Sequence, residues 1–244
     1  MNPFDKVDDP RRRVLIEALA LGLFTTSSMT SNALAWSLFG DKPKKMPAGK
    51  SIYKLTGSAS VNGKAASLAT SVRPGDTVET GKNSEIIFVV GGHSMILRSE
   101  TRLVIEGKKE TESLLIQGLR LLTGKLLSVS RDSPMRFATP TATIGIRGTG
   151  WYAEADPEKT YFCTCYGKTD IEASNDPSSK ETVVAEHHDR PVYILGDSES
   201  GRSIRDAPFI NHTDQELALI ETLVGRTPPF IFPEDDYSGP RRDY

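Results

Sequence analysis

Turn-forming residues interrupt the chain at short intervals between residues 49 and 173, which leaves no room for long helices there. Asn62-Gly63 is a strong hairpin signal, because both residues accept a positive φ. Arg73-Pro74-Gly75-Asp76 is a turn in which proline presets φ and glycine accepts the left-handed conformation. The strand-like segments between such turns recur about every eight to twelve residues, a spacing typical of an all-β unit.

The segments between these turns are rich in apolar, β-branched and aromatic residues, in a chain with 20 glycines and 15 prolines. We therefore predict short strands at Ser51–Leu55, Ala59–Val61, Glu85–Val90, Ser94–Arg98, Arg102–Glu106, Leu114–Ile116, Gly118–Leu122, Lys125–Ser130, Met135–Ala138, Thr143–Ile146, Trp151–Ala155, Tyr161–Tyr166 and Thr169–Ala173. Such strands are too short to be stable singly. They are expected to stack into a sandwich or a solenoid-like module.

The first 35 residues have the features of an export signal and are excluded from the predicted fold. Three arginines, Arg11–Arg13, precede an apolar run from Val14 to Phe24, and Ala33-Leu34-Ala35 has the small-residue pattern of a cleavage site. The apolar run is about half of the roughly 20 residues that a spanning helix requires. The arginines also resemble a twin-arginine signal. We expect a periplasmic or otherwise exported protein, through a Sec- or Tat-like route; an uncleaved anchor or an amphipathic helix is the alternative.

The charge of the chain limits its partners. Thirty basic and 32 acidic residues give a formal charge of −2. Removing residues 1–35 removes four of each sign, so the mature chain keeps this charge. A nearly neutral protein is a poor match for binding nucleic acid through its phosphates or a membrane through a polybasic surface. We expect an envelope protein partner or a small ligand, no nucleic acid, and no full transmembrane helix in the mature chain.

Several motifs occur in a fixed order over roughly half of the chain. They occupy Gly57–Ser84, Gly92–Leu103, Leu119–Leu127 and Phe137–Thr149. The last of them leads from Thr139-Pro140 to Arg147-Gly148-Thr149 and is the most specific. In their order and spacing these motifs resemble the FecR domain, from about Gly57 to Ala173.

The resemblance to the FecR domain implies an exported all-β module that senses or transmits a signal and is not an enzyme. In the best-known members of the family, the module couples an outer-membrane receptor to a cytoplasmic sigma factor. The present sequence is expected to be a standalone module without the cytoplasmic sigma-regulator domain. It also contains no GxSxG, HExxH or phosphate-binding loop, so we predict a non-catalytic binding or signalling protein.

Arg147-Gly148-Thr149 is a candidate binding or structural signature. Gly148 would allow a backbone conformation that other residues avoid, or a close approach to another strand. Arg147 could then direct its donors at carbonyl groups or at a carboxylate. The favoured interpretation is an arginine clamp at a strand corner, and the alternative is a contact with a ligand or partner.

Cys163 and Cys165 are the only cysteines. On a strand their side chains would share one face, with Thr164 on the other. Two residues of strand span about 6.7 Å, which is at the limit of the Cα separation that a disulfide allows. Three interpretations remain open for this pair: buried small hydrophobic residues, a strained redox-active bridge, or two soft metal ligands.

Three of the four histidines lie in the same third of the chain as the cysteines. His187 and His188 are adjacent, and His212 precedes a predicted helix. Together with Cys163 and Cys165 they form a candidate site for Zn²⁺, Cu⁺ or haem, although their spacing matches neither a zinc finger nor a covalent haem motif. The alternative is that the cysteines lie in the core and the histidines on the surface.

The remaining segments have weaker signals. Thr182–Glu186 and Val192–Leu195 read as strands that extend the sheet, Gly196–Ala207 as a polar loop, and His93 as a turn residue. Thr213-Asp214-Gln215-Glu216 is a capping box that begins a helix, with Leu217, Ile220 and Val224 on a face that docks onto the core and Gly225 at its end. The expected organisation is a signal peptide at 1–35, a linker at 36–48, a FecR-like domain at 49–173, an extension at 174–226 and a mobile proline-rich tail at 227–244, which Phe230, Ile231 and Phe232 could anchor.

Overall fold

The computed structural model describes residues 43–107, 114–130, 134–198 and 200–230. These residues form β-strands and one α-helix, which confirms the predicted all-β fold with a short C-terminal helix. The elements are β1 (Ile52–Thr56), β2 (Ala59–Val61), β3 (Lys64–Ala65), β4 (Thr77–Thr80), β5 (Glu85–Val90), β6 (His93–Leu97), β7 (Arg102–Glu106), β8 (Gly118–Ser130), β9 (Met135–Ala138), β10 (Ala142–Ala155), β11 (Lys159–Ala173), β12 (Lys180–Ala185), β13 (Val192–Leu195), β14 (Ile204–Asp206) and α3 (Asp214–Leu223). None of the helical segments in the described ranges is long and apolar enough to cross a membrane.

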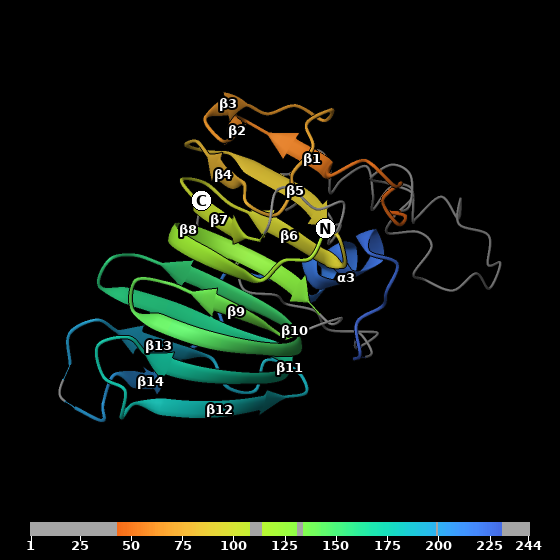
Figure 1. Cartoon of the computed structure of the whole chain (residues 1–244). Coiled ribbons are helices and arrows are strands. Elements are labelled where there is room, and N and C mark those ends of the chain that lie inside the picture. The colour runs from red at the N-terminus through yellow and green to blue at the C-terminus, as the bar shows by residue number, and fades with distance from the viewer. Residues whose placement is uncertain (1–42, 108–113, 131–133, 199, 231–244) are drawn as a thin grey trace, which may run out of the picture. The chain divides into compact units, whose positions relative to one another are not determined.

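The strands belong to one sheet of 14 strands that stack from β2 and β3 at one end to β12 at the other (Figure 1). The main path runs β14-β13-β11-β10-β9-β8-β7-β4-β2-β3, and the remaining strands attach beside it. All pairs are antiparallel except β8 with β9. The sequence left a sandwich and a solenoid-like module open; in the described residues the strands pair into one large, mostly antiparallel sheet.

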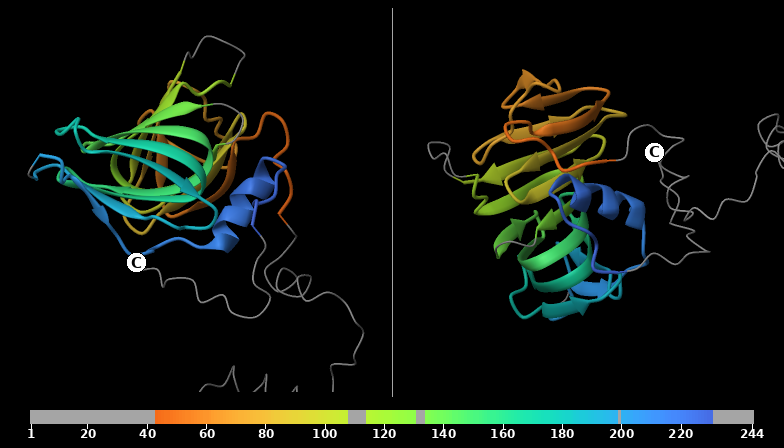
Figure 2. Two further views of the ribbon diagram at one scale, coloured as in Figure 1. Left: turned by 90° about the horizontal axis from the view of Figure 1, so that it is seen from below. Right: turned by 90° about the vertical axis from the view of Figure 1, so that its right-hand side faces the viewer.

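The sheet curls around its interior, and α3 lies outside it (Figure 2). Alternate residues of the central strands therefore face two different environments. On β10, Trp151 and Ala153 face the large apolar cluster inside the curl, whereas Tyr152 faces a smaller cluster beneath α3. We call these two groups the inner cluster and the outer cluster.

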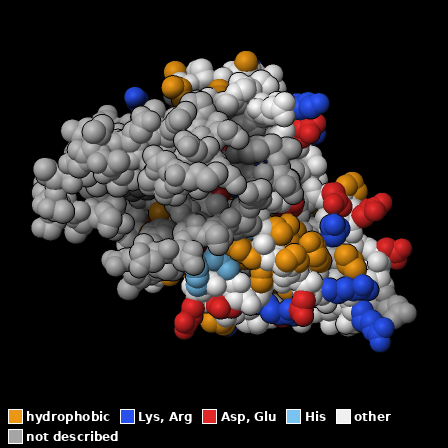
Figure 3. Space-filling view, turned by 180° about the vertical axis from the view of Figure 1, so that it is seen from behind, with side chains coloured by type: hydrophobic (Ala, Val, Ile, Leu, Met, Phe, Trp, Pro, Cys, Tyr) orange, Lys and Arg blue, Asp and Glu red, His pale blue; other side chains and the backbone are white. Residues whose placement is uncertain are grey.

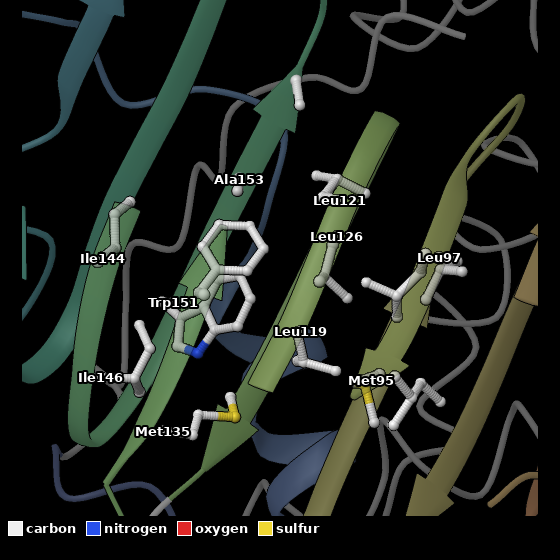
Figure 4. Packing of buried hydrophobic residues seen from close by; sticks show 14 of the residues in the cluster. Met95, Leu97, Leu119, Leu121, Leu126, Met135, Ile144, Ile146, Trp151 and Ala153 are labelled. Carbon is white, nitrogen blue, oxygen red and sulfur yellow. The ribbon is translucent and has the colours of Figure 1, made fainter. Parts of the chain in front are cut away.

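The inner cluster is the main core. Trp151 packs against Phe137 with ring centroids 4.2 Å apart and against Phe162 at 5.8 Å. Leucine and isoleucine side chains such as Leu126 and Ile144 surround these rings (Figure 4). Contacts of this kind, made by fully buried aromatic and aliphatic groups, supply most of the hydrophobic stabilisation of a domain.

Three central strands are longer than the sequence pattern predicts. β8, β10 and β11 have 13, 14 and 15 residues, where we expected pairs of short strands separated by turns. Gly148 and Gly167, with φ of 68° and 92°, bend the backbone without reversing it. The pairing of β10 with β11 shifts register between Arg147 and Gly150 and then continues. These glycines lie at β-bulges, and the predicted breaks between Ile146 and Trp151 and between Tyr166 and Thr169 are wrong.

The tight turns of the N-terminal half are as predicted. Asn62 and Gly63, with φ of 52° and 74°, join β2 to β3. The Arg73–Asp76 turn is closed by a 3.1 Å hydrogen bond from the Asp76 N–H to the Arg73 carbonyl. Two other predictions are wrong. Residues 114–116, predicted as a strand, form none, and the predicted polar loop at Gly196–Ala207 contains the strand β14.

His93 was predicted in a turn, but it is the first residue of β6 and only 4% exposed. Gly91 and Gly92 alone form the turn between β5 and β6. Since Gly91 has a φ of 58°, two residues suffice to reverse the chain, and His93 pairs directly with Val90. The prediction assigned one residue too many to this turn.

The C-terminal extension joins the same sheet. β12 and β13 both pair with β11, and β14 pairs with β13. The predicted capping box is present at Thr213 and Glu216, and Gly225, with a φ of 77°, follows the end of α3. Leu217 and Ile220 are buried in the outer cluster, as the docking interpretation requires. The predicted signal peptide at 1–35 and residues 231–244 of the tail lie outside the described residues.

Candidate metal centre

Strand β11 presents both cysteines to the outer cluster. Cys163 and Cys165 point to the same side, and Thr164 points to the other, where its hydroxyl lies 2.7 Å from that of Thr169. Both thiols are free and fully buried. The predicted sharing of one strand face is thus correct, and the pair lies under protein rather than in solvent.

The turn after β12 brings His188 to the cysteines. Asp189 closes this turn by accepting the N–H groups of Glu186 and His187, at 2.6 and 3.1 Å. His188 has a left-handed φ of 55°, a conformation in which histidine is enriched among residues other than glycine. Its N–H donates to the Cys165 carbonyl at 2.9 Å. As a result, its Nδ1 lies 3.4 Å from the sulfur of Cys163.

His212 reaches the same place from the segment that precedes α3. Its Nδ1 lies 2.6 Å from the Ile210 carbonyl, and its Nε2 lies 3.2 Å from Nδ1 of His188. The imidazole is fully buried and stacks on the Tyr152 ring, with centroids 4.5 Å apart. Phe209 packs against both His212 and His188. The aromatic side chains hold the imidazole in one orientation.

Four of the five predicted ligands come together in the structure. The sulfurs of Cys163 and Cys165 and one ring nitrogen each of His188 and His212 all lie within 4.8 Å of one another. Ligand atoms around a tetrahedral zinc ion are about 3.4–3.8 Å apart, from the usual Zn–N and Zn–S bond lengths. The fifth predicted ligand, His187, is 43% exposed and does not join this group.

Asp214 is a part of the site that the sequence analysis missed. It is the first residue of α3 and is fully buried. One carboxylate oxygen lies 3.0 Å from Nε2 of His188, and the other lies 2.9 Å from Nε2 of His187. A carboxylate in this position orients a histidine ligand and fixes which ring nitrogen carries the proton. The capping box predicted its place in the helix but gave no sign of its partners.

The hydrogen-bond partners define the proton positions on the two imidazoles. The Ile210 carbonyl can only accept, so Nδ1 of His212 carries a proton and Nε2 offers its lone pair. The ionised Asp214 likewise requires a proton on Nε2 of His188. Nδ1 of His188 and Nε2 of His212 therefore face each other beside the Cys163 sulfur, an arrangement that is satisfied either by a proton on Nδ1 of His188 or by a metal ion bound to both nitrogens.

The electrostatics of the cluster favour a thiolate. Burial raises the pKa of Cys163, but hydrogen bonds with Cys165, His188 and His212 outweigh it and hold the pKa well below its usual value. Burial and the bond to Cys163 raise the pKa of Cys165. Burial lowers the pKa of His188, whereas its bonds to Asp214 and Cys163 raise it, to about 9 in balance. Burial lowers the pKa of His212. Without metal, these shifts favour a Cys163 thiolate beside a protonated His188.

The donor set fits a single metal ion better than a haem. Two sulfurs and two imidazole nitrogens in a closed, buried group are the ligands of structural zinc sites. A haem requires a slot for its macrocycle between the axial ligands, whereas these four donor atoms all lie within 4.8 Å of one another. On the face shown in Figure 3, histidine side chains are visible in one small area, and His187 is 43% exposed.

The Arg147-Gly148-Thr149 signature lies elsewhere on β10. Arg147 is 59% exposed and forms a 2.7 Å ion pair with Asp170 on the neighbouring strand β11. Gly148 provides the bend in β10, and Thr149 is fully buried. The arginine therefore pairs with a carboxylate of the adjacent strand, and both the clamp at a strand corner and the contact with a ligand or partner stay predictions.

No family model matches the chain, and no curated protein matches it in sequence. Two crystal structures of a "putative anti-sigma factor from Parabacteroides distasonis ATCC 8503", at 2.50 and 1.65 Å resolution, are similar to it. Each is 12% identical, with a TM-score of 0.42. The matches cover 58% and 59% of this chain and 70% and 74% of the two solved chains. A likeness at this level supports no conclusion about function, so the site is interpreted from its own geometry.

Proposed function

We propose that the chain binds one Zn²⁺ ion through Cys163, Cys165, His188 and His212. The observation that supports this proposal is the convergence of four donor atoms from distant parts of the chain within 4.8 Å. The orientation of the two imidazoles adds to it, since the contacts with Asp214 and the Ile210 carbonyl leave the other nitrogen of each ring directed toward the Cys163 sulfur.

Zinc fits this donor set better than Cu⁺ does. A tetrahedral set of two thiolates and two imidazoles is typical of zinc, whereas Cu⁺ is selected mainly by sulfur ligands. All four ligand positions come from the protein, and none is left for water or substrate. A closed site of this kind is structural or regulatory, which agrees with the expectation of a non-catalytic protein.

The test is a metal titration of the purified chain. We expect one equivalent of Zn²⁺ per chain by elemental analysis, and a Co²⁺ complex with the absorption bands of tetrahedral thiolate coordination. Cys163→Ser and His212→Ala should each weaken binding by more than about 100-fold, which exceeds the loss expected when a residue that only hydrogen-bonds to a ligand is changed. Arg147→Ala, on an exposed pair of the same sheet, is the matched control and should bind normally. Equal, weak binding by all four proteins would refute the proposal.

A second proposal concerns the chain as a whole: an exported FecR-like module that binds a protein partner or small ligand in the cell envelope and transmits a signal. The ordered motifs between Gly57 and Ala173 support it, together with the all-β fold in which they occur. Expression with the native N-terminus should place the protein in the periplasmic fraction, and its mass should be that of a chain that starts at Trp36. A cytoplasmic, uncleaved chain would refute export.

A further inference from the structure

The four candidate ligands come from three segments that are separate in the chain. Strand β11 supplies both cysteines, the turn after β12 supplies His188, and the segment before α3 supplies His212. Asp214 connects the first residue of α3 to the same site. A metal ion at this place would therefore tie the start of α3 to the sheet by coordinate bonds instead of hydrogen bonds.

Without such an ion, α3 docks on the sheet through apolar contacts and buried charges together. Leu217, Ile220 and Leu223 are buried in the outer cluster, and Leu219 and Val224 pack against it. Two of its three buried acids contact cationic partners on other segments: Asp214 with His188, and Glu216 with Arg98 at 3.0 Å. The third, Glu221, pairs at 2.8 Å with Arg226 just after the helix and accepts a hydrogen bond from the Tyr166 hydroxyl of β11. Buried ion pairs add little net stability, because desolvation offsets their attraction. A short helix held by such contacts on the outside of a sheet is expected to open more readily than the central strands.

The other end of α3 contacts the N-terminal segment of the described chain. The Leu223 carbonyl accepts a 2.8 Å hydrogen bond from the N–H of Met46. This contact belongs to residues 43–50, which follow the predicted export signal at 1–35 in the chain, with residues 36–42 between them. The helix is about 15 Å long at 1.5 Å per residue, so it links the candidate metal site to a segment well outside it.

We infer that occupancy of the metal site controls how firmly α3 and residues 43–50 are held against the sheet. The inference rests on the proposed zinc function and adds a regulatory role to it. With the ion bound, any opening that separates His212 from Cys163 must first break the coordination. With the ion removed, α3 keeps its ion pairs, hydrogen bonds and apolar contacts but loses the coordinate bonds next to its first residue. The contact between Leu223 and Met46 then loosens together with the helix.

Amide hydrogen exchange, resolved by residue, tests this inference on the whole mature chain. The Met46 amide reports on the far end of α3, and the amides of α3 report on the helix itself. At free Zn²⁺ 100-fold above its Kd, openings that require loss of the ion should slow by about 100-fold. The Asn62 amide, which donates to the Thr77 carbonyl in the β2–β4 pair, is the internal control and should not change.

Two further measurements distinguish the control of α3 by the metal ion from metal binding itself. A chelator added to the wild-type protein should restore fast exchange, which requires no variant that might misfold. Cys165→Ser should show no effect of Zn²⁺ on Met46. If Zn²⁺ binds at one equivalent but exchange at Met46 stays unchanged, the inferred control of α3 is wrong and the proposed metal site is supported. If no Zn²⁺ binds, the proposed function is wrong and the inference is wrong with it.

Discussion

The two faces of the curled sheet bury different kinds of side chain. The inner cluster is built of aliphatic and aromatic residues around Trp151. The outer cluster, beneath α3, contains both cysteines and three tyrosines, and His212 and buried acids of α3 lie beside it. An apolar core needs no specific partners, but buried titratable groups do. The difference indicates that the inner face serves stability, whereas the outer face serves a function that requires these groups.

Two neighbouring residues of β10 show the contrast. Trp151 packs between Phe137 and Phe162 on the inner face. Tyr152, on the outer face, stacks on His212 and donates its hydroxyl to Glu154 at 2.6 Å. Burial is the main cause that raises the pKa of Tyr152, so this hydroxyl stays protonated and can donate to Glu154. The same strand thus supports the core with one residue and orients a candidate ligand with the next.

The largest loss of stability is expected from a substitution in the inner cluster. Trp151→Ala removes a fully buried indole and leaves a cavity, which should lower the free energy of unfolding by about 3–5 kcal/mol. Urea denaturation with and without Zn²⁺ measures it. The loss should be the same in both conditions, because Trp151 faces away from the candidate site. A loss that depends on Zn²⁺ would contradict the separation of the two faces.

The next effect is expected from the outer face. Wild-type protein at free Zn²⁺ 100-fold above its Kd should gain about 2.7 kcal/mol of stability, and His212→Ala should gain almost none. Thermal unfolding with and without Zn²⁺ gives this difference for each protein. Loss of the His212 stacking contact lowers the metal-free stability as well, so only the Zn²⁺-dependent gain is informative. A variant that keeps the full gain would exclude His212 as a ligand.

A smaller effect is expected from Asp214, which contacts a candidate ligand but is not one itself. Asp214→Asn should weaken Zn²⁺ binding by about 10–100-fold and leave the stoichiometry at one. Glu216→Gln is the matched control, because Glu216 lies in the same turn of α3 but pairs with Arg98. Competition with a chromophoric chelator measures both affinities. Equal losses in the two variants would show that Asp214 acts through helix docking and not through His188.

The sequence predicts the outer face only in part, for physical reasons. Cys163 and Cys165 could be placed on one strand face, because side chains alternate strictly along a strand. His187 and His188 looked equivalent, but the left-handed backbone at His188 directs only that ring to the cysteines. The role of Asp214 depends on a contact across 26 residues, for which no local pattern exists.

The fold was predictable to a similar degree. Turn positions with a proline or an Asn-Gly pair reverse the chain as expected, since they act through local φ preferences. Gly148 and Gly167 have the same left-handed preference, but pairing on both sides keeps β10 and β11 continuous. Whether such a glycine makes a turn or a bulge is decided by the neighbouring strands, and that information is not local.

The smallest effect is expected from Arg147, whose exposed pair with Asp170 is typical of surface ion pairs that contribute about 0.2–1 kcal/mol. Arg147→Ala should lower the free energy of unfolding within this range at pH 7 and leave Zn²⁺ binding unchanged. The pKa of Asp170 lies below its usual value, first through the Thr182 hydroxyl and then through Arg147. This pairing therefore stabilises the fold above the unfolded carboxyl pKa, and its contribution is lost as the pH falls.

Wild type and Arg147→Ala should consequently converge in stability on acidification, since a protonated Asp170 has no charge for the arginine to pair with. An NMR titration of the Asp170 carboxyl should show a pKa that moves toward its usual value in the variant but stays lowered, because the Thr182 hydrogen bond remains at 2.8 Å. A loss well above 1 kcal/mol, or one that persists in acid, would mean that Arg147 holds more than this carboxylate. The signature would then have a second contact, and the ligand or partner interpretation would regain its weight.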